Sequence, residues 1–152
     1  MDPVFSQIAL TLLICAFGIW ISVVDFREHR IPDAASLPLL AVGLGLSGYA
    51  TQIALADRLI GMGLGFLLFW LIGALYFRRH GQEALGLGDA KLFAAAGAWL
   101  GWSALPIVLL LATLMGLAFA ILRGRRETRG LAFGPWLMGG FILRWLHLLL
   151  FR

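Results

Sequence analysis

Two aspartates carry the chemistry that this sequence could perform. Asp25 directly follows the apolar segment ISVV, and Asp89 lies within GLGDAK, residues 86–91. Two carboxyl groups held close together cannot both ionise easily, so they share a proton and titrate as a pair. One member of such a pair can act as a general base while the other acts as a general acid. This chemistry requires a fold that brings Asp25 and Asp89 together.

Each aspartate also has a purely structural interpretation. Asp25 could be an interfacial acid that pairs with His29, one helical turn later. Asp89 could cap the N-terminus of a helix. Gly86 and Gly88 precede Asp89, however, and glycine permits unusual backbone dihedrals and the close approach of another chain. We therefore expect that an extended peptide could reach Asp89 along this segment.

Other candidate residues are less informative. Asp33 and Asp57 each open a predicted helix, where aspartate is a preferred cap, so we expect both to be structural. The single cysteine, Cys15, lies in an apolar run and cannot form a cysteine metal site by itself. A phosphate-binding loop is also excluded at residues 86–91, because no GxxxxGK followed by Ser or Thr is present. We expect no metal and no other cofactor.

The composition places the chain in a membrane. Hydrophobic residues make up 61% of the 152 residues, charged residues make up 13%, and the mean hydropathy is +0.93. Soluble domains carry about a quarter charged residues. The apolar runs are long and show no strand-like alternation, so we predict an all-α integral membrane protein with one domain, residues 1–152. Membrane lipid, rather than nucleic acid, is the expected partner of the basic residues.

We predict six membrane spans. They are residues 4–24, 34–52, 58–77, 89–101, 105–122 and 133–151. The stretch 89–122 has no charge after Lys91, and it is too long for one crossing and short for two. Gly101, Ser103 and Pro106 provide a turn within it. The fourth span is therefore short, and it must be tilted, partly immersed or shielded by its neighbours.

The arginines indicate the orientation. With six spans and the N-terminus outside, three loops face the cytoplasm and contain most of the basic residues. The basic residues in these loops are Arg27, Arg30, Arg78, Arg79, Arg123, Arg125, Arg126 and Arg129. The distribution follows the positive-inside rule, and it puts Asp25 and Asp89 at a similar depth on the cytoplasmic side.

Small residues are concentrated in the second and third predicted spans. They are Gly43, Gly45, Ser47, Gly48, Gly61, Gly63, Gly65 and Gly73. In lipid, small side chains let helix backbones approach closely, so we expect these positions to lie at helix contacts. We assign no chemistry to them.

Three segments resemble sequence blocks of the bacterial prepilin peptidases, also called type IV leader peptidases. They are DFREHRIPD (25–33), GLGDAKLFAAAGAWLGW (86–102) and FGPWLMGG (133–140). The resemblance implies that Asp25 and Asp89 are the two catalytic aspartates of an intramembrane aspartyl protease. It also implies that Gly86 and Gly88 are the glycines, and Lys91 the lysine, of the GxGD block.

The resemblance identifies further supporting residues without giving them a chemical role. They are Glu83, Lys91, Pro32 and the Phe133-Gly134-Pro135 turn. Full-length bacterial members carry a four-cysteine zinc domain associated with N-methylation of the product. This sequence has one cysteine and resembles the short forms of Flp/Tad-type pilus systems or the archaeal preflagellin peptidases. No N-methyltransferase activity is therefore expected.

The resemblance also implies a substrate, a reaction and a location. The substrate is a prepilin-like precursor, cleaved at the cytoplasmic face of a bacterial inner (plasma) membrane that the chain crosses several times. The ionised aspartate takes a proton from the attacking water, and the protonated one polarises the scissile carbonyl. Which aspartate is the initial base stays open. We also expect the carboxyls of Asp25 and Asp89 to be too far apart to share a proton until substrate orders residues 78–88.

Two other classes of protein are compatible with six spans and intramembrane acids. A proton-coupled transporter could use the aspartates as a proton relay, and a secretion complex could contain the chain as a non-enzymatic component. Transporters often contain internal repeats with interrupted helices, and the two halves of this sequence show no convincing repeat. The three matching blocks favour the peptidase.

Overall fold

The computed structural model describes residues 3–81, 86–123 and 132–151, and within these residues the chain is helical, without β-strands. The helices are α1 (Pro3–Glu28), α2 (Asp33–Ala50), α3 (Leu55–His80), α4 (Leu87–Leu100), α5 (Leu105–Arg123) and α6 (Gly134–Leu150), with a short 3-10 turn, η1 (Trp102–Ala104). Their bounds agree with the six predicted segments to within a few residues.

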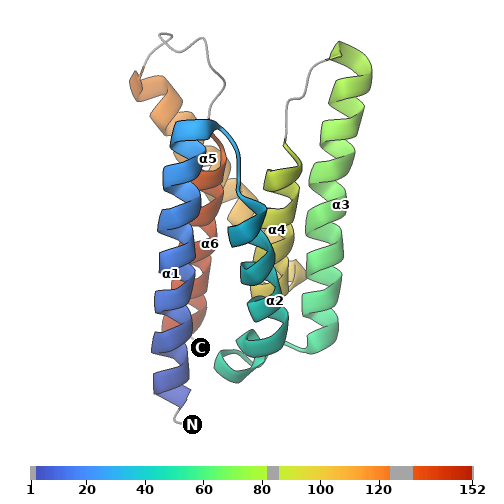
Figure 1. The fold of residues 1–152 in the computed structure, drawn as a ribbon. Helices are drawn as coiled ribbons and strands as arrows, with labels where there is room; N and C mark the ends of the chain where they lie inside the picture. The colour runs from blue at the N-terminus through green and yellow to red at the C-terminus, as the bar shows by residue number, and fades with distance from the viewer. Residues whose placement is uncertain (1–2, 82–85, 124–131, 152) are drawn as a thin grey trace.

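Consecutive helices run in alternating directions, so the molecule is an up-and-down bundle (Figure 1). The C-terminal end of α1 and the N-terminal ends of α4 and α6 therefore lie at the same end of the bundle. The last turn of α3, with Arg78, Arg79 and His80, lies at this end too. The two segments that contain Asp25 and Asp89 are thus brought to the end that carries basic residues.

Among the described residues, three helices are long and apolar enough, by length and composition, to cross a membrane. They comprise residues Val4–Glu28, Leu55–His80 and Trp102–Leu122. Helices α2, α4 and α6 are shorter, with 18, 14 and 17 residues. Large apolar side chains such as Leu12, Leu67 and Leu114 are exposed on the long helices, as expected for surfaces that face lipid.

Helix α4 lies at the centre of the bundle. Ala90 and all residues from Leu92 to Leu100 are buried, and the helix packs chiefly against α3 and α2. Its small side chains, including Gly97, allow this close packing from several sides. Of the three possibilities that the sequence left open for the short fourth segment, the structure shows shielding by its neighbours.

Glycines bring α3 into close contact with α4. A Cβ atom on Gly61 would lie 2.7 Å from the carbonyl oxygen of Gly97, and one on Gly65 would lie 2.8 Å from that of Phe93. Larger side chains at either position would separate the two helices. The expected packing role of glycine is confirmed at Gly61 and Gly65, whereas Gly63 faces open space with nothing within 4 Å.

A glycine in α2 makes room for a buried tryptophan of α4. Gly43 lies against the indole ring of Trp99, and the Trp99 Nε1–H donates a hydrogen bond to the Leu39 carbonyl at 2.8 Å. The indole therefore fills the α2–α4 contact with its only polar atom satisfied. Gly45 has nothing within 4 Å, so the predicted packing role is wrong at that position.

Arg58 is buried in the first turn of α3, at the end of the bundle opposite Asp25 and Asp89. Only 8% of its surface is exposed. Its Nη1 donates to the Leu44 carbonyl and to the Ser47 hydroxyl, each at 3.0 Å. Gly48 leaves space for the guanidinium. The sequence placed residue 58 only at the start of the third predicted span, and the structure places the Arg58 side chain inside the α2–α3 contact.

The predicted capping roles of Asp33 and Asp57 are wrong. Pro32 and Ala54 occupy the N-cap positions of α2 and α3, and no side chain caps either helix. Asp57 instead accepts a hydrogen bond from the Trp102 Nε1–H at 3.1 Å. Both aspartates connect elements distant in sequence, as described for Asp33 below.

Candidate active site

Asp25 projects from the last turns of α1 and is 5% exposed. Its Oδ2 accepts a hydrogen bond from the backbone N–H of Gly134 at 2.9 Å. Gly134 opens α6, and the first N–H groups of a helix have no partner within the helix, so this donor is free to bind a carboxylate. A Cβ on Gly134 would lie 2.7 Å from the same oxygen. The contact therefore requires glycine at position 134.

Asp89 lies in the first turn of α4 and is half-buried. Its backbone N–H donates to the carbonyl of Gly86, the N-cap residue, at 3.1 Å. The Asp89 carboxylate also interacts with the Gly86 backbone and with the charge of Asp25. Residue 89 therefore does not occupy the N-cap position, and its side chain faces the other aspartate.

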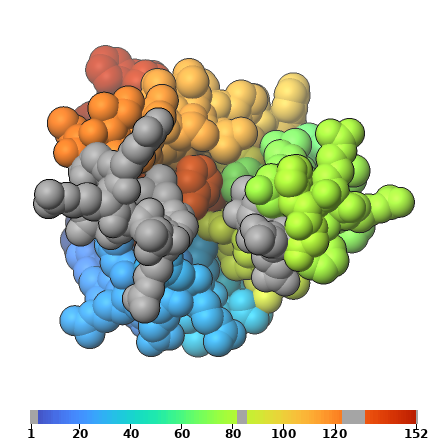
Figure 2. Space-filling view, turned by 90° about the horizontal axis from the view of Figure 1, so that it is seen from above, coloured from blue at the N-terminus to red at the C-terminus, as the bar shows by residue number. Residues whose placement is uncertain are grey.

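Asp25 and Asp89 line one open cavity with a volume of about 1250 Å³. Its walls are the end of α1 with its connection to α2, one face of α3, the start of α4, and the residues Ala132 and Phe133. Figure 2 looks onto this end of the bundle and shows the surface hollowed between the blue end of α1 and the green end of α3. The structure thus brings the two predicted site residues together at one concave surface.

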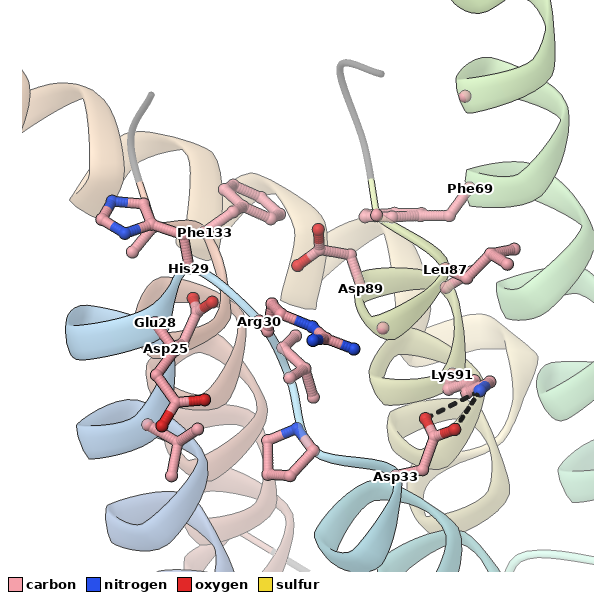
Figure 3. A pocket seen from close by; sticks show the side chains of 18 of the residues that line it. Asp25, Glu28, His29, Arg30, Asp33, Phe69, Leu87, Asp89, Lys91 and Phe133 are labelled. Atoms are coloured by element: carbon pink, nitrogen blue, oxygen red, sulfur yellow. Dashed lines mark hydrogen bonds and ion pairs between the residues drawn. The ribbon is translucent and has the colours of Figure 1, made fainter. Parts of the chain in front are cut away.

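The two carboxyl groups lie on opposite sides of this cavity. Figure 3 shows Asp25 on the α1 side and Asp89 at the start of α4. Within the part of the chain that the structure describes, no hydrogen bond joins the two carboxyls, and neither forms an ion pair.

Gly86 and Gly88, the two glycines before Asp89, have ordinary backbone conformations. Gly86 has extended backbone dihedrals, φ −74° and ψ 151°, and Gly88 is helical. A Cβ on Gly88 would lie 2.8 Å from the Cβ of Ile31. Neither glycine uses the unusual dihedrals that glycine permits, and Gly88 allows close packing against the α1–α2 connection.

Lys91 does not contact Asp89. Its Nζ lies 2.7 Å from both carboxylate oxygens of Asp33, at the start of α2 (Figure 3). The resemblance gave Lys91 no chemical role, and the structure shows that it forms an ion pair between α4 and α2. Glu83, the other predicted supporting residue, lies outside the described residues.

Aromatic side chains form part of the cavity wall. The ring of Phe69 in α3 lies 4.5 Å from that of Phe93 and 6.2 Å from that of Phe133, measured between centroids. Phe69 and Phe133 both line the cavity. The sequence marked Phe133 only as part of a turn, and it gave no signal for Phe69, which is one apolar residue among many in α3.

Among residues 3–81, 86–123 and 132–151, no cluster of three or more His, Cys, Asp or Glu side chains could hold a metal ion. The charged or titratable side chains of the described residues that line the cavity are Asp25, Arg27, Glu28, His29, Arg30, Asp33, Asp89 and Lys91. Two carboxyls at one cavity are suited to acid–base chemistry.

Several known proteins are similar to this chain. Prepilin leader peptidase/N-methyltransferase of Escherichia coli (strain K12) is 42% identical over 139 residues, which cover 89% of this chain and 61% of that protein. The protein of the same name from Dickeya chrysanthemi is 43% identical over 134 residues, covering 84% and 47%. The one from Aeromonas salmonicida (strain A449) is 37% identical over 153 residues, covering 98% and 51%.

The chain spans about half the length of these relatives. No solved structure shows a significant match. Residues 12–121 match the model of the Type IV leader peptidase family, a range that includes Asp25 and Asp89 and ends before Gly134. Because this match covers most of the sequence, the chain belongs to the Type IV leader peptidase family.

Proposed function

We propose that this chain is an intramembrane aspartyl endopeptidase that removes the leader of prepilin-like precursors. The observation that carries the proposal is the convergence of Asp25 and Asp89, from α1 and α4, on one open cavity of a protein in the leader peptidase family. Relatives that share 37–43% of its residues are named prepilin leader peptidases. These observations favour Asp25 and Asp89 as the catalytic pair.

The reaction uses one shared proton. The ionised carboxyl takes a proton from water as the water oxygen attacks the scissile carbonyl carbon, and the protonated carboxyl gives its proton to the carbonyl oxygen. The resulting tetrahedral intermediate returns that proton, the first carboxyl protonates the amide nitrogen, and the carbon–nitrogen bond breaks. The pair ends with one proton, as it began.

The position of the pair matches the architecture of the proposed substrate. A prepilin-like precursor has a short basic leader followed by an apolar helix that stays in the membrane, so its scissile bond lies at the membrane surface. Asp25 lies near the end of α1 and Asp89 at the start of α4, so both lie at one end of a bundle in which three of the described helices are long and apolar enough to cross a membrane. The proposed location is the cytoplasmic face of a bacterial inner membrane.

The proposal is tested by reconstituting the purified protein in lipid vesicles with a prepilin-like precursor and identifying the products by mass spectrometry. We expect one cut between the basic leader and the apolar helix, with activity retained in EDTA. A precursor that differs only by an added charge at the centre of its apolar helix serves as the control and should be cleaved more slowly, since the charge weakens its insertion into the membrane. An intact precursor after prolonged incubation with folded, correctly inserted protein would contradict the proposal.

A further inference from the structure

We propose that the ion pair between Asp33 and Lys91 is a positioning device that sets the distance between Asp25 and Asp89. The inference rests on the proposed function and concerns two residues that line the same cavity but are not the proposed catalytic pair. Its structural basis is that the pair joins the two segments that carry the aspartates. Asp33 opens α2 shortly after the end of α1, and Lys91 lies two residues after Asp89.

The connection between α1 and α2 is built to hold a fixed position. His29 adopts a left-handed conformation, with φ 52°, which is uncommon for residues other than glycine. The turn puts Ile31 between α4 and α6: a Cβ on Gly88 would lie 2.8 Å from Ile31 Cβ, and one on Gly134 would lie 3.2 Å from Ile31 Cδ1. Ile31 therefore acts as a spacer between the first turns of α4 and α6.

The ion pair holds the α1–α2 connection, which contains Ile31, against α4. Both carboxylate oxygens of Asp33 lie 2.7 Å from the Lys91 ammonium. Packing of Ile31 against Gly88 prevents α4 from moving closer to the connection, and the ion pair prevents it from moving away. Asp89 lies between Gly88 and Lys91 in the sequence, so its position relative to α1 is limited in both directions.

The Asp33–Lys91 pair is partly exposed, so its effect on the position of Asp89 can be distinguished from its effect on stability. The side chains of Lys91 and Asp33 are 27% and 57% exposed, and exposed ion pairs contribute little to the stability of a fold. A small displacement of a catalytic group, in contrast, can lower a rate strongly. The pair is thus expected to affect the rate of cleavage far more than the unfolding of the protein.

The test compares Lys91→Met, Asp33→Asn and the charge swap Lys91→Asp/Asp33→Lys in vesicles. Each single variant should lower kcat about tenfold, with KM, the pH optimum and the unfolding midpoint unchanged. The swap should restore kcat to within about threefold of the wild-type value, because it rebuilds the pair. Arg78→Gln removes a positive charge from an exposed site at the same end, so it is the matched control.

Three results of this comparison would overturn the inference. A charge swap as slow as the single variants would show that the pair itself is not needed. A shifted pH optimum with an unchanged maximal rate would show that Lys91 acts on Asp89 through its charge. A fall in the unfolding midpoint that parallels the loss of rate would show a structural role only.

A second measurement does not depend on cleavage, so failure of the proposed function can be distinguished from failure of this inference. In a Cys15→Ser background, Asp25→Cys and Asp89→Cys allow the two positions to be cross-linked by a short bifunctional reagent. Lys91→Met should lower the cross-linking rate severalfold, and the charge swap should restore it. An unchanged rate in Lys91→Met would overturn the inference whether or not the protein cleaves a precursor.

Discussion

The bundle buries ionisable side chains at both of its ends and surrounds them differently. At one end, the Arg58 guanidinium donates hydrogen bonds to the Leu44 carbonyl and the Ser47 hydroxyl. At the other, Asp25 receives one backbone hydrogen bond, and it faces a second acid across an open cavity. A buried charge is stable only when it is paired or well hydrogen-bonded. Arg58 meets this requirement as a structural residue would, whereas the two acids are left available for chemistry.

The largest expected effect is the loss of either acid. Asp25→Asn and Asp89→Asn should each lower the rate of precursor cleavage by a factor of about 10³ or more, because neither amide can exchange the shared proton. The measurement is initial rate per folded protein in vesicles. Asp57→Asn is the matched control at the opposite end, where it keeps the oxygen that accepts from Trp102. Near-normal turnover by Asp25→Asn or Asp89→Asn would refute the assignment of the pair.

The next effect concerns the hydrogen bond that orients Asp25. Gly134→Ala should lower the rate about 10–100-fold, because the new Cβ would lie 2.7 Å from Asp25 Oδ2 and must displace the carboxyl. Gly139→Ala adds the same methyl to the same helix, where it meets only the flexible end of Met115. If the two variants have equal rates, the contact between α6 and Asp25 is not important for catalysis.

Substitution of Arg58 should lower the stability of the protein and leave the cleavage rate per folded molecule unchanged. Arg58→Ala leaves buried acceptors without a donor and opens a cavity, so it should lower the free energy of unfolding by about 2–4 kcal/mol. Arg58→Lys keeps a donor and should lower it less. Unfolding in detergent gives the stability, and the cleavage rate per folded molecule should stay unchanged. A lower rate with normal stability would indicate that this end communicates with the cavity.

The smallest expected effects distinguish two glycines on one helix. Gly61→Ala should destabilise the protein by about 1–3 kcal/mol, because its Cβ would press on the backbone of α4. Gly63→Ala faces open space and should be neutral or stabilising by up to about 1 kcal/mol, as alanine favours helices. Unfolding in detergent measures both. Equal values would mean that the close α3–α4 contact contributes little to stability.

Much of the fold could be predicted because lipid imposes strong limits on the sequence. Long apolar runs and charged breaks predicted the six helical segments, and the short run after Asp89 predicted a helix that is tilted, partly immersed or shielded. The structure shows that α4 is shielded. Three of the described helices are long and apolar enough by themselves to cross a membrane. Helices as short as α4 owe their position to packing, which the local sequence does not specify.

The partners of polar residues could not be predicted in the same way. Lys91 binds Asp33 and not its neighbour Asp89, because the connection between α1 and α2 places Asp33 beside α4. Arg58 is buried because Gly48 leaves space for it on another helix. Both outcomes depend on how helices distant in sequence pack together. The convergence of Asp25 and Asp89, in contrast, needed only the alternating directions of the helices.

The central claim is that Asp25 and Asp89 act as one unit, and the double variant tests this most directly. Residual cleavage of a prepilin-like precursor is measured for Asp25→Asn, for Asp89→Asn and for the two combined, at equal amounts of folded protein. Residues that act as a unit are strongly non-additive, so all three variants should show the same residual rate. A double variant slower than both singles by the product of their separate losses would contradict the claim.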